Sequence, residues 1–381
     1  MRIGSRVAIV GAGVIGLSLA WELSRRGAIV QVFERGHAAR EASWAAAGIL
    51  PAASRELAPD PLERLRGMSH ELYPHWSQAL AETTGIDVEL RRCGGLYLAS
   101  SAGEAASLLA GLEYQRDLQI EMQRLTAEQL ATDEPALATW GRSDRFRAAV
   151  LSPNEWKIRP PALLTALLSA CKANGVQIHE QITARLKIDS HQALVQVASG
   201  NGTGQSCESD HVVVCGGAWT GQLAAALGFG QSLIPIRGQI MMHRFDCPPL
   251  KRIVNEGHRY LVPREDGRLI VGSCEEEVGF QKGTTENVLQ SLTKWSESIL
   301  PCLSSMKAEK CWSGLRPGTF DGFPILGKVP DVVNLFIASG HYRSGIHLAP
   351  ATAVVMADML EGRPASVDIA PFRVARLMSH R

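Results

Sequence analysis

The chain has 381 residues, of which 45% are hydrophobic, and its 39 Lys and Arg residues nearly balance its 38 Asp and Glu residues. This length and apolar content predict a large buried core, divided into two domains or one domain with a substantial insertion. The net charge of +1, without a long basic run, argues against nucleic acid or an anionic membrane surface as a partner. We therefore expect a small-molecule ligand.

Cysteine usage and hydropathy favour a cytoplasmic protein. The eight cysteines form no CxxC pair and have no histidine-rich tract beside them, so we expect reduced, buried thiols and no metal site. The uncharged run at 7–21 is too short to cross a bilayer. We expect neither membrane insertion nor an export signal.

The first predicted unit is a strand, a turn and a helix. The apolar run from Val7 to Val10 is typical of a buried parallel strand, and from Val14 the apolar residues recur at helical spacing. The turn between them reads GAGVIG. Because N–H groups at the start of such a helix face a bound phosphate, Val14 and Ile15 are predicted to contact a cofactor.

The three glycines of this turn predict a dinucleotide site. Gly11 permits the tight turn, Gly13 lets the backbone approach a pyrophosphate, and Gly16 lets the helix lie close to the sheet. A chance GxGxxG pattern is the weaker interpretation, since strand, helix and second strand follow in the required order.

The second predicted strand, Ile29 to Phe33, ends at an acidic residue. The Glu34 carboxylate is placed to accept hydrogen bonds from a ribose 2′-hydroxyl and disfavours a 2′-phosphate there. Its neighbour Arg35 is included among the cofactor contacts. NAD and FAD share this ADP half, so both cofactors remain open at this point.

The next segments alternate between core and nucleotide-domain patterns. A long helix is predicted over Asp60 to Gly85, and a helix from Pro160 with a strand at Val176 to Ile178 forms a further crossover unit. A buried strand at Val212 to Cys215 meets Gly216 and Gly217. These two glycines indicate either a second close approach of the backbone to the cofactor or an ordinary tight turn.

The rest of the chain predicts a second, sheet-based domain and a return to the first. Antiparallel strands are expected at 234–245, 252–254, 260–263 and 269–272, followed by a helix at 284–300. The motif at 311–327, a strand at 335–338 and a helix from Ile346 then restore glycine-rich turns. The predicted cofactor domain is 1–80, 150–228 and 311–381, and the predicted substrate domain is 81–149 and 229–310.

Several motifs together carry a family resemblance. They are GAGVIG followed by Glu34, REASWAAAGIL at 40–50, YLVPREDGRLIVGS at 260–273, WSGLRPGTFDGFPILG at 312–327 and GHYRSGIHLAPATA at 340–353. Over nearly its whole length the chain resembles the glycine oxidase branch of the D-amino-acid oxidase and sarcosine oxidase superfamily. The resemblance implies an α/β fold, with a Rossmann-like FAD-binding domain interleaved with a substrate domain on an antiparallel β-sheet. It further implies non-covalent FAD and a homo-oligomer.

The resemblance also implies cofactor contacts beyond the first turn. The residues that line the pyrophosphate and the isoalloxazine would be Ser43, Trp44, Ala46, Ala47 and Gly48. The backbone of Val176 would hold the adenine. The loop that closes over the flavin ring would contribute His341, Arg343, Ser344, Gly345 and Ile346. Backbone N–H groups at the start of the last helix would stabilise negative charge that develops on the reduced flavin.

Arg316 and Tyr260 are the predicted substrate residues. The planar guanidinium of Arg316 can hold a carboxylate through two parallel hydrogen bonds, and the resemblance implies a further bond from the Tyr260 hydroxyl. A surface arginine and a core tyrosine are the alternatives. Arg343 either touches substrate or braces the closing loop. Glu275, in the acidic run SCEEEVGF, either faces the pocket and favours an extra cation or lies in a solvated turn.

The expected reaction is the oxidation of glycine or another small amine, such as sarcosine or a small D-amino acid. Hydride transfer to flavin N5 would leave an imine that water hydrolyses, and dioxygen would reoxidise the flavin to give hydrogen peroxide. The resemblance suggests a link to thiamine production. Cys311 is expected to be a packed thiol rather than a tether for FAD. The alternatives are a dehydrogenase that passes electrons to a quinone or partner subunit, a non-catalytic or RNA-modifying module, and an NAD-dependent enzyme.

Overall fold

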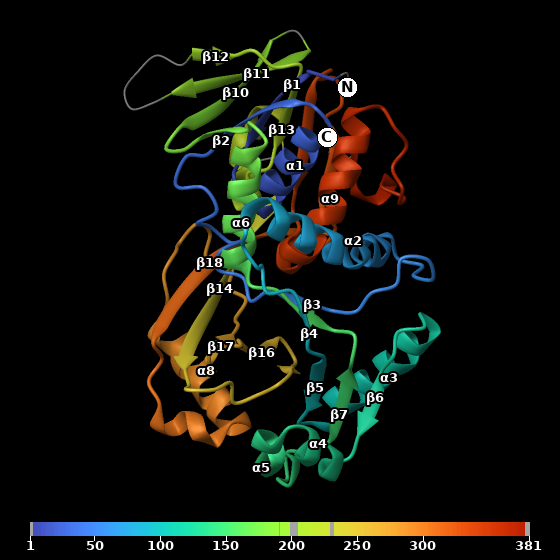
Figure 1. Ribbon diagram of the computed structural model, residues 1–381, viewed down its shortest axis with the longest axis vertical. Coiled ribbons are helices and arrows are strands. Elements are labelled where there is room, and N and C mark those ends of the chain that lie inside the picture. The colour runs from blue at the N-terminus through green and yellow to red at the C-terminus, as the bar shows by residue number, and fades with distance from the viewer. Residues whose placement is uncertain (1–2, 190, 199–204, 229–231, 378–381) are drawn as a thin grey trace.

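Two large sheets organise the chain, one in the upper and one in the lower half of Figure 1. The computed structural model describes residues 3–189, 191–198, 205–228 and 232–377. The upper sheet has six strands in the order β19-β20-β13-β1-β2-β9. These strands are β1 (Arg6–Val10), β2 (Ile29–Phe33), β9 (Gln177–His179), β13 (His211–Val214), β19 (Ile325–Lys328) and β20 (Leu335–Ser339).

The strands of this sheet run parallel except for β19, which pairs antiparallel with β20. Along β1, Val7 and Ile9 pack with the helices, whereas Ala8 and Val10 pack against a second sheet on the opposite face. Burial on both faces explains why the sequence of β1 is a continuous apolar run. The predicted parallel strand at the N-terminus is confirmed.

Four helices cover one face of this sheet: α1 (Val14–Arg25), α2 (Pro61–Thr84), α6 (Pro160–Ala173) and α9 (Gly345–Leu360). Both α1 and α2 contact α6 and α9. The Asp60 side chain caps α2 by accepting a hydrogen bond from the Leu62 N–H at 2.7 Å, and Gly85 ends it at φ +72°. The predicted long helix is therefore confirmed. The other face is covered by β10 (Thr183–Asp189), β11 (Gln192–Ala198) and β12 (Gln205–Cys207).

The lower sheet has eight strands in the order β18-β14-β17-β16-β15-β5-β7-β6. They are β5 (Gly95–Ala99), β6 (Gln123–Leu125), β7 (Ala148–Ser152), β14 (Leu233–Arg244), β15 (Ile253–Glu256), β16 (Arg259–Pro263), β17 (Arg268–Gly272) and β18 (Lys310–Thr319). All neighbours pair antiparallel except β15 and β5, which are parallel. The sequence predicted an antiparallel sheet. The sheet is instead mixed, because one pair of neighbouring strands is parallel.

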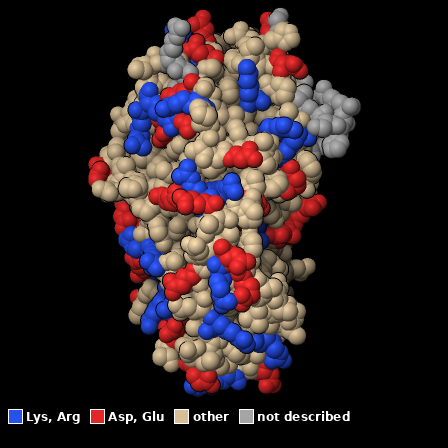
Figure 2. All heavy atoms as spheres, turned by 90° about the vertical axis from the view of Figure 1, so that its right-hand side faces the viewer, with Lys and Arg blue, Asp and Glu red and all other residues tan. Residues whose placement is uncertain are grey.

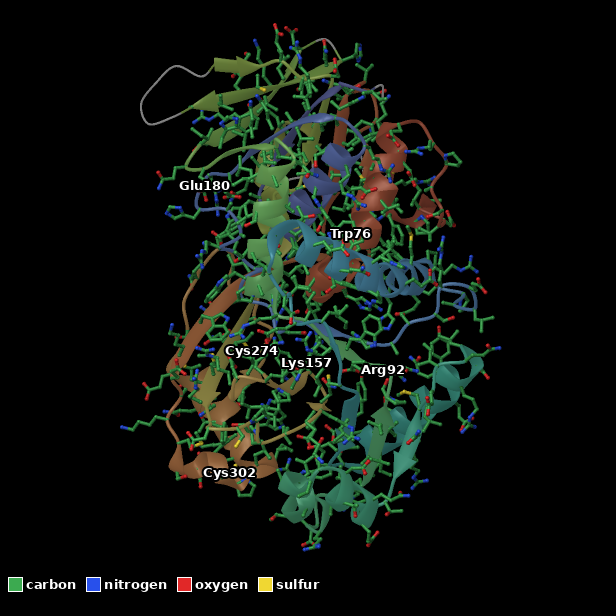
Figure 3. The ribbon with its side chains drawn as sticks, in the orientation of Figure 1. Trp76, Arg92, Lys157, Glu180, Cys274 and Cys302 are labelled. Atoms are coloured by element: carbon green, nitrogen blue, oxygen red, sulfur yellow. The ribbon has the colours of Figure 1, made fainter. Side chains whose placement is uncertain are left out.

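Helix α8 (Glu286–Ile299) packs against one face of the lower sheet. The remaining elements are α3 (Ala102–Asp117), α4 (Ala127–Asp133), α5 (Ala138–Gly141), α7 (Thr220–Leu223) and a small sheet of β3 (Ile49–Leu50), β8 (Trp156–Lys157) and β4 (Arg91–Arg92). The Lys157 ammonium, at the junction between the halves in Figure 3, donates to the Pro263 carbonyl at 2.9 Å. The small sheet thereby ties the two halves together.

Two strands cross the predicted domain division. β18 pairs with β14 from Leu233 opposite Thr319 to Met242 opposite Lys310, so it lies in the lower sheet although 311–381 was assigned to the cofactor domain. β7 in the lower sheet spans the predicted boundary at residue 150. The glycines of the GLRPG motif mark close packing along a strand, not a turn between domains. The predicted boundaries between the cofactor domain and the substrate domain therefore stay predictions.

The surface carries charged residues of both signs (Figure 2). Figure 2 shows acidic and basic side chains interspersed over the face in view. Among the helices of the described segments, none combines the length and apolarity needed to cross a membrane.

The cysteines depart from the expected uniform burial. All eight are free, and Cys171 and Cys215 are buried, but Cys247, Cys302 and Cys311 are exposed. Cys302 lies at the lower end of the molecule in Figure 3. The expectation that Cys311 is packed was wrong, because it lies near the start of β18, the edge strand of its sheet.

Candidate active site

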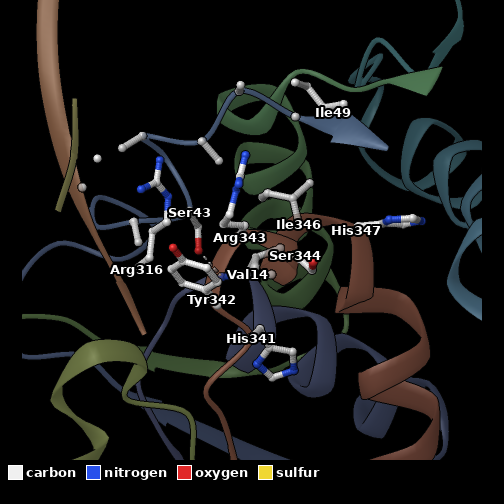
Figure 4. Close-up of a pocket in the computed structure, with 18 of the residues that line it drawn as sticks. Val14, Ser43, Ile49, Arg316, His341, Tyr342, Arg343, Ser344, Ile346 and His347 are labelled. Carbon is white, nitrogen blue, oxygen red and sulfur yellow. Dashed lines mark hydrogen bonds between the residues drawn. The ribbon is translucent and has the colours of Figure 1, made fainter. Parts of the chain in front are cut away.

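A pocket of about 570 Å³ lies between the two sheets. It brings together most of the predicted site residues: Gly13, Val14, Ile15, Ser43, Ala46, Ala47, Gly48, Gly217, Tyr260, Arg316, His341, Arg343, Ser344, Gly345 and Ile346. It is not lined by the predicted residues Gly11, Gly16, Glu34, Arg35, Trp44, Val176 and Gly216. Figure 4 shows part of the lining, with Ser43 beside Val14 and with Arg316 and Arg343 on either side of Tyr342.

The three glycines before α1 have different surroundings. A Cβ on Gly11 would lie 2.4 Å from the Cys215 carbonyl oxygen, and one on Gly16 would lie 2.0 Å from the Gly11 oxygen. A Cβ on Gly13 would meet only the Ser43 hydroxyl, at 3.4 Å. Gly11 and Gly16 therefore allow close packing of backbone on backbone, whereas Gly13 leaves space on the pocket side.

The start of α1 is suited to an anion. Gly13 is its N-cap, and the Val14 N–H donates to the Ser43 hydroxyl at 3.0 Å (Figure 4). The first N–H groups of a helix have no partner within it and carry partial positive charge. This end of the pocket can therefore accept a pyrophosphate.

The Glu34 carboxylate holds the turn around the glycines. One of its oxygens accepts the Ala12 N–H at 2.9 Å, and the other accepts the Gly36 N–H at 3.0 Å. A carboxylate has further lone pairs, so binding of a ribose stays a prediction. The neighbouring Arg35 guanidinium stacks over the Trp219 ring at 3.8 Å, outside the pocket.

Three other predicted cofactor residues also lie outside the pocket. Trp44 packs edge-on against Trp312, with ring centroids 5.7 Å apart. The Val176 N–H donates to the Cys171 carbonyl at 2.9 Å, which leaves its own carbonyl for any adenine contact. A Cβ on Gly216 would meet Leu223 at 2.5 Å, so this glycine accommodates the following short helix.

The segment between β20 and α9 forms one wall of the pocket. Figure 4 shows Tyr342, Arg343, Ser344 and Ile346 grouped there, while the His341 ring points away. That ring lies 3.0 Å from the Thr352 hydroxyl, and burial lowers its pKa to about 3. The imidazole is therefore neutral, and only the His341 backbone can face a cofactor.

Arg316 extends along the face of the lower sheet into the pocket. Its Nη1 donates to the Cys274 carbonyl at 2.9 Å and its Nη2 donates to the Ser273 hydroxyl at 2.5 Å. A Cβ on Gly238, on the neighbouring strand β14, would lie 2.2 Å from Nη2. Glycine at 238 thus makes room for the guanidinium to lie flat on the sheet.

Tyr260 lies beside this guanidinium. It pairs with Gly272 across the strands, and a Cβ there would lie 2.6 Å from the phenol ring. Burial raises the pKa of Tyr260, although the nearby Arg316 and Arg343 guanidinium groups oppose the shift. The hydroxyl therefore keeps its proton and can donate a hydrogen bond to a ligand carboxylate.

Arg343 is paired in the structure. Its Nη1 lies 3.2 Å from Glu275 Oε1, and both side chains are partly exposed. Burial, followed by a hydrogen bond with Glu275, raises the pKa of Tyr342. Glu275 is exposed and does not itself line the pocket, but it contacts two residues that do, Arg343 and Tyr342.

Several pocket residues were not predicted from the sequence. Tyr342 adopts φ +47°, a conformation rare outside glycine, between two residues that were predicted. Arg66 donates to the Ser344 hydroxyl at 3.0 Å from α2, and His258 lies in the turn before β16. Arg66 and His258 belong to no motif with a stated chemistry, so only the fold brings them to the pocket. Tyr342 lies within the GHYRSG motif, but the resemblance assigned it no role.

The residues present fit a flavin nucleotide. Small and apolar side chains at Ala45, Ala46, Ala47, Ile49 and Ile240 line part of the pocket and leave a surface suited to a flat ring. Among the described residues, no group of three or more potential metal ligands occurs.

Comparison with known proteins decides the family. Residues 6–359 match the family model described as FAD dependent oxidoreductase. The chain belongs to this family. The resemblance, the fold class and the FAD cofactor expected from the sequence are therefore confirmed.

Individual relatives of this FAD-dependent oxidoreductase cover almost its whole length. A glycine oxidase of Pseudomonas aeruginosa is 33% identical over 371 residues, which cover 97% of this chain and 98% of that protein. The crystal structure of glycine oxidase from Geobacillus kaustophilus is similar with a TM-score of 0.90 at 32% identity, and covers 98% of this chain and 99% of its own. A bifunctional protein ThiO/ThiG of a Synechocystis species is 32% identical over 385 residues, which cover 100% of this chain and 55% of that protein.

A buried acid lies behind two of the residues that line the oxidoreductase pocket. Glu155 accepts hydrogen bonds from the Tyr97 hydroxyl at 2.5 Å and the Asn255 amide at 3.4 Å, and burial raises its pKa from 4.5 to about 7. Tyr97 and Asn255 both line the pocket. Glu155, whose carboxyl stays protonated up to about pH 7, therefore supports two pocket residues from beneath.

Replacing Glu155 by Gln is expected to flatten the pH dependence of stability. Because the folded-state pKa lies above the unfolded value, the stability from the neutral carboxyl is present below pH 4.5 and is lost as pH rises through about 7. The wild type should therefore lose roughly 2–3 kcal/mol more unfolding free energy than the variant when the pH is raised from about 5 to about 8. Denaturant unfolding at the two pH values measures this difference, and parallel pH profiles for the two proteins would contradict it.

Proposed function

We propose that this FAD-dependent oxidoreductase oxidises glycine or another small amine that carries a carboxylate, such as sarcosine or a small D-amino acid. The observation that carries the proposal is the pair formed by Arg316 and Tyr260 on the floor of the pocket. The names of the two glycine oxidases that match over nearly their full length support it.

Carboxylate binding would orient the substrate. The Arg316 fork can receive a carboxylate in two parallel hydrogen bonds, in exchange for its present bonds to Ser273 and Cys274. The Tyr260 hydroxyl would donate a third bond. Three directed bonds fix the carbon next to the carboxylate relative to the pocket wall, which lowers the entropic part of the barrier.

The amine would react without a side-chain base. FAD, when bound, supplies the hydride acceptor for this carbon. The lone pair of a neutral amine assists the loss of hydride. Water then hydrolyses the imine, which gives glyoxylate and ammonia from glycine, or glyoxylate and methylamine from sarcosine. Backbone N–H groups at the start of α9, from Gly345 and Ile346, would stabilise developing negative charge at this wall.

Several further properties are part of this proposal. FAD would be held non-covalently. Cys311 and Arg316 are five positions apart on β18, so their side chains lie on opposite faces of the strand. Because Arg316 lines the pocket, Cys311 faces away from it, which supports this part of the proposal. Dioxygen would be the electron acceptor, and the protein would be a cytoplasmic homo-oligomer. A role in thiamine production is supported by the ThiO/ThiG relative, of which this chain covers 55%.

Anaerobic mixing of the purified holoenzyme with glycine, sarcosine, D-alanine or D-proline tests the proposal. We expect at least one of them to bleach the flavin absorbance, and subsequent air to restore it with formation of hydrogen peroxide. Bleaching without peroxide would instead support a dehydrogenase that uses a quinone or a partner subunit. If none of these amines bleaches the flavin, the proposed function is wrong.

A further inference from the structure

The three adjacent acids after β17 have three different environments. Glu276 is held by β14, where Arg237 Nη2 lies 3.0 Å and Gln239 Nε2 2.8 Å from its carboxylate. These contacts lower the pKa of Glu276 to about 2, with the hydrogen bond from Arg237 as the main cause. Glu277 is exposed. Glu275 is exposed as well, but of the three acids it alone contacts residues that line the pocket, Arg343 and Tyr342.

The anchoring of Glu276 explains the direction of Glu275. The backbones of Arg237 and Glu276 exchange two hydrogen bonds, of 2.8 and 3.1 Å, as an isolated bridge. Side chains alternate between the two sides of such an extended segment. Because Glu276 faces β14, Glu275 faces the opposite way, where its carboxylate lies 3.2 Å from Arg343.

Two guanidinium groups serve the same part of the pocket. Arg316 and Arg343 both line it, and both lower the pKa of His258 from nearby, although burial is the main cause of that shift. Figure 4 shows them on either side of Tyr342. Only Arg343 has a carboxylate partner, whereas Arg316 contacts a hydroxyl and a carbonyl.

We propose that Glu275 is a specificity-determining residue, which restricts the pocket to substrates with one carboxylate by neutralising Arg343. This inference rests on the proposed function and extends it. A substrate held by Arg316 places any second carboxylate against the Glu275–Arg343 pair. There the second carboxylate must displace Glu275 from the Arg343 guanidinium, and the negative charge of Glu275 repels it. A methyl group or a hydrogen at the same position meets no such repulsion.

Two unreactive ligands measure this effect directly. Methoxyacetate carries a methyl group on its ether oxygen where diglycolate carries a second carboxymethyl group. Neither ligand has an amine to oxidise. Calorimetry with the holoenzyme is expected to show that Glu275→Gln binds diglycolate about tenfold more tightly than the wild type, since a repelling charge is removed and a charge-assisted hydrogen bond becomes possible. Methoxyacetate should change by less than about twofold.

Glu277→Gln is the matched control. It removes the same charge from the same turn without a contact to Arg343, so it should leave the affinities for both ligands at the wild-type values. An equal change for both ligands in Glu275→Gln, or a tenfold gain in Glu277→Gln as well, would overturn the inference. Failure of every variant to bind either ligand would also overturn it, because Arg316 would then hold no carboxylate.

Turnover separates the inference from the proposed function. The ratio of kcat/KM for iminodiacetate to that for sarcosine should rise about tenfold in Glu275→Gln. If the wild type reduces its flavin with no small amine, the proposed function fails, while the binding comparison still decides the role of Glu275. A D-amino acid with a cationic side chain completes the set: if Glu275→Gln slows only this substrate and leaves diglycolate binding unchanged, Glu275 selects a cation and our inference is wrong.

Discussion

Replacing Arg316 by Met is expected to lower kcat/KM for glycine by about two to three orders of magnitude. A bidentate charge-assisted pair contributes about 3–4 kcal/mol, and each 1.4 kcal/mol corresponds to roughly a tenfold change in rate. The loss includes orientation as well as affinity, because Tyr260 alone leaves the carboxylate free to turn. Anaerobic stopped-flow measurement of flavin reduction over a range of glycine concentrations gives both the limiting rate of reduction, which reports orientation, and the apparent affinity for glycine.

Two further variants make this result specific. Arg316→Lys keeps the charge but loses the planar fork, so it should recover only part of the rate. Arg244→Met removes an exposed arginine near the end of β14 and should behave as the wild type. The flavin absorbance of Arg316→Met should be normal, since Arg316 belongs to the lower sheet. Near-normal flavin reduction by Arg316→Met would remove the basis for the proposed function.

Local patterns in the sequence were sufficient for the elements that build the upper half. The strand, glycine turn and helix at the N-terminus, and the helix from Asp60, follow from burial on both faces, the caps and apolar periodicity. Each of these signals lies within about 25 residues of chain. The family resemblance added the C-terminal loop and the choice of FAD over NAD, which the N-terminal motif left open.

The details of the substrate end could not be predicted, because they depend on pairing between distant strands. Room for the Arg316 guanidinium comes from Gly238 on β14, and room for the Tyr260 ring comes from Gly272 on β17. Neither glycine lies in a turn motif, so the sequence gives no reason to single it out. The pair between Glu275 and Arg343 likewise joins a turn of the lower half to the loop before α9.

The three glycines of the first turn were assigned different roles from the motif, and the structure offers a way to separate them. Gly13 has ordinary backbone angles, φ −78° and ψ −176°, and open space beyond its Cα toward the pocket. Gly11 has φ +110° and, like Gly16, would place a Cβ against backbone. A side chain at 13 is therefore compatible with the fold, whereas one at 11 or 16 is not.

Gly13→Val is accordingly expected to fold but to lose FAD. The branched side chain would fill the space next to the first N–H groups of α1, where a pyrophosphate must approach, and should weaken FAD binding at least about a hundredfold. The loss of a favourable N-cap residue should cost about 1 kcal/mol or less of stability. The ratio of flavin to protein absorbance after dialysis measures binding, and the far-ultraviolet circular dichroism of the apoprotein measures folding.

The comparison with two other glycine variants decides whether Gly13 acts on the cofactor or on the fold. Gly111→Val introduces the same side chain on the exposed helix α3, where nothing lies within 4 Å of the added Cβ, and should retain FAD. Gly11→Val should lose both FAD and folded protein, because its Cβ would overlap the Cys215 carbonyl. A Gly13→Val protein that keeps its flavin at the wild-type ratio would place the pyrophosphate elsewhere, and the start of α1 would then have only a structural role.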